Sequence, residues 1–595
     1  MHKIQFFKQN KLLTFIFVFY LIFQLCILLQ FKNNDPTFYS FIKITDSPGF
    51  YYAAVDIVNK NILGANGTYL QSPLYYYFLA ILIIIFNNLF FIKFVQILFG
   101  SFNIIIIYFI SLYVFNNKKY AIASTIILCF NGISIFYNTL ILREFLVVLL
   151  NNLTILFFIL ALKNKNLKYS FLTGILFGLA ILTRENFFIF FPVLIIIFFL
   201  KNKKKFISFI IGFCFIYSIL IIRNYLSNAP LFKISSKGVY EFAAGNVPES
   251  NGLGWVELSS AQQIANNNKS LISAAFAILK LYKDNPINFL KLQLNKFLGF
   301  LNNYEIPNNY NFYFTKKNFS SLLNFSFVNS GIIFILSFIG FFFSFAKYKK
   351  NIYLWILISY IILYSFSVIG IYVISRFRIP VIVFLTIFAG VGLINIFEFI
   401  KKIEIKKIVI IFIIGIITYY FSFSYKPQGL NKEADLALAY ANIGAYFRDI
   451  KEYDKALQYY FEAIKYYAPE EAILTIANIY KEKNDINNYL NWLEKCIEYY
   501  PQNQNIIFKV ASIYFDNSNY AKAKYYFEKI INSNDFSFNA FFKLGIIYFL
   551  EKDFIKAEYY WNEALKLKPD SFEIKHNLAQ IKKMLENPDR KIEFK

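Results

Sequence analysis

The chain has 595 residues, of which 57% are hydrophobic and 21% aromatic, and its formal net charge is +25. That apolar content excludes an ordinary soluble protein, and apolar runs long enough to cross a bilayer recur as far as residue 424. The charge lies almost wholly in residues 1–429, which hold 38 Lys and Arg against 12 Asp and Glu, whereas residues 430–595 hold 23 and 24. Lysine-rich loops that set membrane topology explain this charge better than nucleic-acid binding does.

The first apolar run, residues 12–31, is too long for the core of a signal peptide and has no small-residue cleavage site, so we expect an uncleaved membrane anchor. Short lysine-rich linkers belong on the cytoplasmic side of a membrane. They are NNKK (116–119), KNKNLK (163–168), KNKKK (201–205), KYKK (347–350) and KKIEIKK (401–407). If residues 73–88 crossed, the N-terminus and the first linker would lie on opposite sides. We therefore expect 73–88 to lie in or dip into the outer leaflet.

This reading predicts a polytopic helical bundle of about eleven spans in the cell (inner) membrane, with a cytoplasmic N-terminus. The spans are expected near 12–31, 91–115, 120–140, 145–162, 169–183, 187–200, 206–222, 328–346, 352–372, 379–399 and 407–424. Two large loops, 32–90 and 223–327, then face outward, and residues beyond 430 are extracytoplasmic.

The charged residues of the membrane part are distributed unevenly in this topology. Of its twelve acids only Glu398 and Glu404 fall inside. The chain has 54 Lys and 7 Arg, and five of the arginines fall at outer ends of spans: Arg143, Arg184, Arg223, Arg376 and Arg378. Because the planar guanidinium group suits bidentate contact with phosphate or carboxylate, we expect an anionic ligand at the outer face. The alternative is that these arginines only snorkel to the interface.

Asp46 stands in the first outer loop, in KITDSPGFYYAAVDIV (43–58). A carboxylate under apolar cover beside a bilayer can hold a raised pKa and act as a base. Alternatively, Asp46 caps a short helix whose first turn includes Pro48. Glu144, in ILREF, is either a second acid or an ion-pair partner of Arg143 or Arg184. Glu305 is either a ligand contact or a cap within its loop.

Several segments occur in a characteristic order: Asp46 in the first outer loop, SPLYYYFLA (72–80), GLAILTRENF (178–187), Arg223-Asn224 after a span, YEIPNN (304–309) and SRFRIP (375–380). Over about residues 10–400 this set resembles the bacterial GT-C glycosyltransferases related to protein O-mannosyltransferases and lipid A aminoarabinose transferases. Members of that family carry the key acid in the first loop, often as an Asp-Glu pair. Here the pair is Asp46-Ser47, which leaves open which carboxylate supplies a second acid.

The resemblance implies inverting transfer of a sugar from a polyprenyl-phosphate carrier to a protein, lipid or glycan acceptor at the extracytoplasmic membrane face. Asp46 is then the expected general base and Glu144 the second acid. The residues expected to bind the lipid phosphate or sugar are Arg376 and Arg378 first, then Arg184, Lys296, Tyr51 and Glu305. No metal-ligating residues are assigned: the two histidines, His2 and His576, lie outside the expected spans, although a carboxylate-bound divalent cation stays open. The four cysteines predict no disulfide framework.

Residues 437–570 repeat with a period of 33–34. Small residues recur at Gly444, Ala477, Ala511 and Gly545, each followed three positions later by an aromatic residue. The pattern resembles the tetratricopeptide repeat, so we expect an α-solenoid of about four repeats with a capping helix at 571–585. The predicted domains are thus a transmembrane glycosyltransferase module, 1–429, and a repeat domain, 430–595, which binds the acceptor or a partner protein.

Two other functions remain as alternatives, a transporter or flippase for lipid-linked sugars and a membrane scaffold that displays the repeats. A related glycan polymerase or ligase would also fit the outer-face chemistry. Transporters place charges within spans near the bilayer midplane, whereas most spans here are free of charge. The charge distribution therefore favours chemistry at the membrane surface.

Overall fold

The computed structural model describes residues 11–64, 66–268, 270–533 and 535–586. His2, Lys3 and Lys8, which belong to the expected cytoplasmic N-terminus, lie outside these residues. The described residues are helical and contain no strand, only two isolated bridges that join Asn131 to Val328 and Leu253 to Val373. The chain divides into two compact units, Met1–Ala439 and Tyr440–Lys595. The all-α prediction is confirmed.

Among the described residues, eight helices are long and apolar enough to cross a membrane. They are α2 (Lys11–Asn34), α5 (Leu89–Phe115), α8 (Glu144–Lys163), α11 (Lys203–Leu226), α17 (Ser330–Tyr348), α18 (Ile352–Ile369), α19 (Ser375–Lys401) and α20 (Ile405–Tyr419), the last continued by η3 (Tyr420–Ser424). Each corresponds to one of the eleven predicted spans.

The other three predicted spans are shorter or interrupted helices. Span 120–140 is α6 (Lys118–Cys129) followed by α7 (Gly132–Asn138), with Asn131 capping α7 through its side chain. Span 169–183 is α9 (Lys168–Thr183). Span 187–200 is a 3-10 turn, η1 (Glu185–Phe190), and then α10 (Phe191–Lys201), whose first turn contains a proline. Polar caps and a proline therefore divide these apolar runs.

The core of the bundle is α19, which packs against α17, α6 and α8. Its contact with α17 is backbone to backbone. A Cβ atom on Gly340 would lie 1.8 Å from the carbonyl oxygen of Phe388, and one on Gly392 would lie 2.0 Å from that of Leu336. Small residues drive helix association in lipid because they allow such close approach. α19 is therefore held firmly, and the arginines at its first turn have a rigid base.

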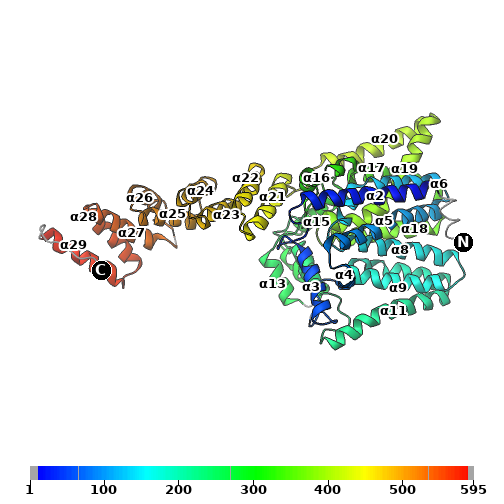
Figure 1. Ribbon diagram of the computed structural model, residues 1–595, viewed down its shortest axis with the longest axis horizontal. Helices are drawn as coiled ribbons and strands as arrows, with labels where there is room; N and C mark the ends of the chain where they lie inside the picture. The colour runs from blue at the N-terminus through cyan, green and yellow to red at the C-terminus, as the bar shows by residue number, and fades with distance from the viewer. Residues whose placement is uncertain (1–10, 65, 269, 534, 587–595) are drawn as a thin grey trace. The chain divides into compact units, whose positions relative to one another are not determined.

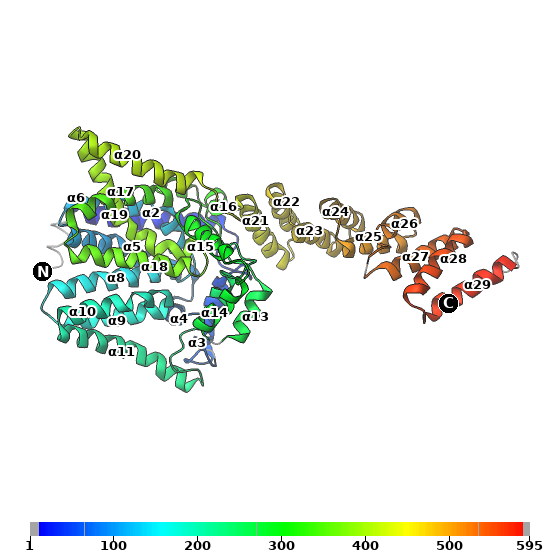
Figure 2. The ribbon, with the colours of Figure 1, turned by 180° about the vertical axis from the view of Figure 1, so that it is seen from behind.

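The lysine-rich linkers gather at one end of the bundle. Lys163 Nζ donates to the carbonyl of Tyr113 (3.2 Å), and Lys205 Nζ donates to that of Ala161 (2.7 Å). The ring of Tyr348 packs on Phe115 at a centroid distance of 5.3 Å. The opposite end carries α3 (Asp46–Asn59), α13 (Ser259–Asn267) and α15 (Pro286–Leu301), as Figures 1 and 2 show.

The segment expected to stay in the outer leaflet contains α4 (Leu74–Phe86). Its 13 residues span about 20 Å, which is shorter than the hydrocarbon core of a bilayer. Tyr75 and Leu79 are buried, whereas Ile81 and Ile84 are exposed. α4 packs mainly on α3, so it supports the segment that carries Asp46.

The second large loop folds into a small helical cap. It contains α12 (Gly238–Ala244), α13, α14 (Leu271–Leu281), α15, α16 (Phe312–Asn318) and η2 (Ser321–Phe325). Ala243, Ala261, Ala274 and Ile278 form a buried cluster that joins α12, α13 and α14. In Figure 2, α13 and α14 lie at the same end of the bundle as α3.

The repeats form successive helix pairs, α21 (Lys432–Asp449) with α22 (Tyr453–Tyr466), α23 (Glu470–Glu482) with α24 (Ile486–Tyr499), α25 (Gln504–Asp516) with α26 (Tyr520–Glu528), and α27 (Ser537–Leu550) with α28 (Phe554–Leu567). The final helix is α29 (Phe572–Glu586). A Cβ atom on Gly545 would lie 2.3 Å from the Trp561 ring. The small residue of this repeat therefore lets its helix approach an aromatic side chain of the paired helix.

Candidate active site

Asp46 is the first residue of α3, and its carboxylate is bonded to side chains from three distant segments. Arg376 Nη1, at the start of α19, donates to Oδ2 over 2.6 Å. Asn309 Nδ2 donates to the same oxygen over 3.0 Å, and Gln71 Nε2 donates to Oδ1 over 3.3 Å. The carboxylate is thus the point where the two large loops, 32–90 and 223–327, meet α19, a role that exceeds helix capping.

The pKa of Asp46 differs from the sequence-based expectation. Burial by itself would raise the pKa, but the neighbouring charges of Arg376 and Lys237 and the hydrogen bond from Asn309 outweigh burial and hold the pKa well below its usual range. The expected rise in pKa is therefore wrong in this state of the protein. Asp46 is a carboxylate anion whose basicity is restrained by Arg376.

Two adjoining cavities lie at this site. The first, the Asp46 cavity, is lined by Asp46, Tyr52, Tyr69 and Tyr76 among others. The second is the arginine cavity. Its lining includes Arg143, Arg184, Glu185, Glu241 and Leu271. Leu70, Gln71 and Lys237 line both cavities, so the two spaces share a wall.

The arginine cavity contains buried donors that have no partner. Arg184 Nη2 forms an ion pair of 2.5 Å with Glu144 Oε1, and both side chains are buried. Arg143 Nη1 donates to the carbonyl of Thr183 over 3.3 Å. Among the described residues the Nε groups of both arginines lack a hydrogen-bond partner. A buried donor without a partner costs free energy, so these guanidinium groups suit an anionic ligand.

Arg376 connects the two predicted acids. It is buried, and it interacts electrostatically with both Asp46 and Glu144. Arg143 in turn interacts with Glu144, Arg184 and Arg376. The structure therefore brings together four of the predicted site residues: Asp46, Glu144, Arg184 and Arg376. Arg143 joins them, although the resemblance assigns it no role. The scarcity of arginine in a lysine-rich chain is the sequence signal that marks it.

Three further polar residues reach the site without a clear sequence signal. Gln71 and Asn309 donate to Asp46, and Lys237 lines both cavities. Asn309 ends the segment YEIPNN, which the resemblance includes as a motif without giving that residue a role. Gln71 and Lys237 lie in loop sequence whose pattern indicates no particular chemistry.

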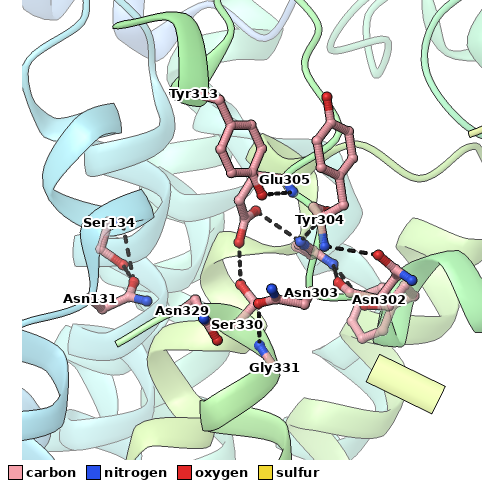
Figure 3. Close-up of polar contacts among 12 residues, drawn as sticks. Asn131, Ser134, Asn302, Asn303, Tyr304, Glu305, Tyr313, Asn329, Ser330 and Gly331 are labelled. Carbon is pink, nitrogen blue, oxygen red and sulfur yellow. Dashed lines mark hydrogen bonds and ion pairs between the residues drawn. The ribbon is translucent and has the colours of Figure 1, made fainter. Parts of the chain in front are cut away.

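Arg378 and Glu305 occupy a different place. Arg378 Nη1 donates to the carbonyls of Phe300 (3.0 Å) and Asn302 (2.6 Å). Its Nη2 donates to the carbonyl of Tyr304 (2.9 Å) and to Glu305 Oε2 (2.8 Å). Glu305 also accepts from Ser330, and its backbone N–H donates to Tyr313 Oη over 3.0 Å, as Figure 3 shows. Arg378 thus ties the loop after α15 to the start of α19.

Lys296 and Tyr51 line neither of the two cavities. Lys296 is fully buried and donates to Asn246 Oδ1 over 2.7 Å, and burial lowers its pKa to about 7. Tyr51 packs on Phe41 at a ring distance of 5.2 Å, and its neighbour Tyr52 lines the Asp46 cavity instead. Among the described residues, no group of three or more His, Cys, Asp or Glu is placed to hold a metal ion.

The structure thus combines an apolar helical bundle, with a carboxylate and arginines clustered at one end, and a unit of helical repeats. Residues 70–225 match the family model of dolichyl-phosphate-mannose-protein mannosyltransferase. The match extends from α4 to the end of α11 and includes Arg143, Glu144 and Arg184. This segment of the chain is therefore similar to the mannosyltransferase family.

The repeat unit matches tetratricopeptide repeat models at residues 470–503 and 538–571, which confirms the predicted repeats. Solved structures similar to the chain include a mutant of MamA, at 18% identity over 25% of this chain and 83% of that chain, with a TM-score of 0.21. They also include a tetratricopeptide repeat protein from Bacteroides fragilis, at 21% identity over 25% and 83% of the two chains, with the same TM-score. No curated protein matches the chain.

Proposed function

We propose that this protein transfers a sugar from a polyprenyl-phosphate carrier to an acceptor at the extracytoplasmic face of the cell membrane, with inversion at the anomeric carbon. The mannosyltransferase family match supports glycosyl transfer and makes a mannosyl donor the first to test. The observation that carries the proposal is the Asp46–Arg376 ion pair, which stands where a carboxylate-lined cavity adjoins an arginine-lined one.

The donor phosphate binds in the arginine cavity. Arg143 and Arg184 line this cavity, and their guanidinium groups supply positive charge to it. As the bond between the anomeric carbon and the phosphate oxygen breaks, negative charge develops on the leaving phosphate, and fixed guanidinium groups in a buried site stabilise that charge. Glu144 holds Arg184 in place through the 2.5 Å ion pair. We assign Glu144 this orienting role.

The acceptor binds in the Asp46 cavity and loses its proton to Asp46. The acceptor oxygen or nitrogen forms a bond to the anomeric carbon, the phosphate leaves with the bonding electron pair, and the acceptor proton passes to the carboxylate. Arg376 adjusts the basicity of Asp46. When an anionic phosphate attracts Arg376, less of its charge acts on Asp46, and the carboxylate becomes a stronger base at the moment when it is needed.

Arg378 and Glu305 position the site. Arg378 lies two residues after Arg376 on the same helix and is already bonded to three carbonyls and to Glu305. It therefore holds the first turn of α19, from which Arg376 reaches Asp46. Lys296 and Tyr51 line neither cavity, and we assign them no contact with the donor.

The orientation and the repeats complete the proposal. The end of the bundle that carries Asp46 is extracytoplasmic, the N-terminus is cytoplasmic, and the modules are 1–429 for transfer and 430–595 for binding. Tetratricopeptide repeats serve protein interaction, so here they hold the acceptor or a partner protein. Reporter fusions placed after residue 430 test the orientation, because a cytoplasmic signal there would contradict it.

The decisive experiment measures sugar transfer by membranes that contain the protein. Labelled polyprenyl-phosphate sugars, mannosyl first, are supplied to wild type and to Asp46→Asn at equal expression. We expect transfer by wild type and a fall of about 10²-fold or more in the variant, which keeps the shape of the side chain but loses the base. Equal transfer by the two proteins would overturn the assignment of Asp46.

A further inference from the structure

The cap helix α14 exposes an apolar stripe. Ile272, Phe276 and Leu279 are spaced by four and three residues, so they share one face of the helix, and they are 72%, 65% and 50% exposed. The other face carries Ala274 and Ile278, which are buried against α12 and α13. α14 therefore buries one apolar face, with Ala274 and Ile278, in the cap and exposes a second apolar face.

The next helix, α15, repeats this arrangement. Its exposed apolar residues follow a spacing of three, four and three: Ile287, Leu290, Leu294 and Phe297. Its inner face buries Leu292 and Lys296. We call these seven side chains of the two helices the α14–α15 stripe. Exposed apolar side chains at helical spacing on two successive helices point to a site of interaction.

The surroundings of the stripe indicate what covers it. α15 packs against α18 and η3, which belong to the membrane bundle. α18 exposes Ile362 and Phe366, as a helix in contact with lipid does. Lys280, Lys283 and Lys291 are exposed on or beside the two cap helices. An apolar stripe flanked by lysines and adjoining a lipid-facing surface is typical of a helix that lies in the plane of a membrane interface.

We propose that α14 and α15 lie in the outer boundary of the bilayer, with the α14–α15 stripe among the acyl chains and the lysines among the lipid headgroups. Leu271, at the start of α14, also lines the arginine cavity. The membrane surface therefore reaches the opening of that cavity. If the proposed function is correct, a lipid-linked donor reaches Arg143 and Arg184 along this surface without exposing its isoprenoid chain to water.

Fluorescence quenching tests the position of the helices without any enzyme assay. Phe276→Trp and Phe297→Trp are reconstituted in bilayers of brominated phosphatidylcholine, whose bromines quench tryptophan within the acyl region. The matched control is Gln263→Trp on the exposed side of the neighbouring helix α13, and the wild-type signal accounts for the native tryptophans. We expect strong quenching of both stripe tryptophans and little of the control.

Quenching of the stripe tryptophans no greater than that of the control would overturn the proposal. In that case the oligomeric state shows whether a second copy of the chain covers the stripe instead of lipid. A dimer that Phe276→Gln converts to a monomer would show that a second copy covers the stripe.

A second experiment tests the consequence for the donor. Transfer from a mannosyl phosphate with a C55 isoprenoid is compared with transfer from the C10 analogue. For Phe276→Gln we expect a several-fold rise in KM for the C55 donor and no change for the C10 donor. Equal effects on both donors would contradict the membrane route. Failure of wild type to use either donor would contradict the proposed function, while the quenching result would still decide the position of the helices.

Discussion

Arg376 donates a 2.6 Å hydrogen bond to Asp46, joining the first turn of α19 to the first residue of α3 across 330 positions of sequence. The contact has two consequences. It keeps Asp46 ionised, and it makes the basicity of that carboxylate depend on where the Arg376 charge is engaged. An anionic ligand that binds nearby therefore changes the chemistry of Asp46 without touching it.

The pH dependence of transfer tests this coupling. In wild type the pKa of Asp46 lies below its usual range, so activity is expected to persist as the pH falls toward the ordinary aspartate value of about 3.9. In Arg376→Gln the burial of Asp46 remains but the opposing charge is gone, so its pKa rises. We therefore expect lower activity and an acidic limb of the kcat/KM profile displaced to higher pH. An unmoved limb would contradict the coupling, and Arg448→Gln in the repeat unit is the control.

Arg143 provides a test of the donor phosphate site. Its side chain is buried, lines the arginine cavity and has an unpartnered Nε group. We expect Arg143→Ala to lower kcat/KM for the donor by roughly 10- to 100-fold, because a charge-assisted hydrogen bond is worth about 1.5–3 kcal/mol. Steady-state kinetics at several donor concentrations give the value. A fall seen only in the dependence on acceptor concentration would place the phosphate elsewhere.

Substitution of Arg378 or Glu305 is expected to act first on the stability of the folded protein and only through it on sugar transfer. Breaking a buried ion pair by removing one partner costs about 3–5 kcal/mol, and both side chains are buried here. Arg378→Met should therefore lower the melting temperature of the purified protein in detergent and reduce kcat, with little change in the KM for the donor. A raised donor KM at an unchanged melting temperature would instead show that Arg378 contacts the phosphate directly.

The lowered pKa of Lys296 predicts that the free energy of unfolding rises at alkaline pH. Its pKa is about 7 in the folded protein, below the ordinary lysine value of about 10.4. Between these values the unfolded chain binds more protons, so the folded state gains stability as the pH rises from 7 to 10. Thermal unfolding of Lys296→Met should show a smaller rise over this range than wild type. Lys291→Met, which alters an exposed lysine of the same helix, should behave like wild type.

Much of the architecture could be predicted because its signals are local. The eight long apolar helices coincide with predicted spans, and the repeat period of 33–34 predicted the helix pairs from α21 to α28. The interrupted spans were harder to predict, because the single residues Asn131 and Pro192 divide apolar runs whose overall hydrophobicity stays high. The candidate site could be predicted only in part. The sequence identified the acids and arginines, but it did not show which side chains form ion pairs or hydrogen bonds with each other.

The sequence by itself determined that this protein is a helical membrane protein with appended repeats, because hydrophobic length and periodicity are properties of neighbouring residues. Only the tertiary structure decided which arginine serves which acid. Arg376 and Arg378 are two positions apart on one helix, and at about 100° per residue their side chains leave the helix in nearly opposite directions. One therefore reaches Asp46 at the cavity wall, and the other reaches Glu305 in the loop after α15.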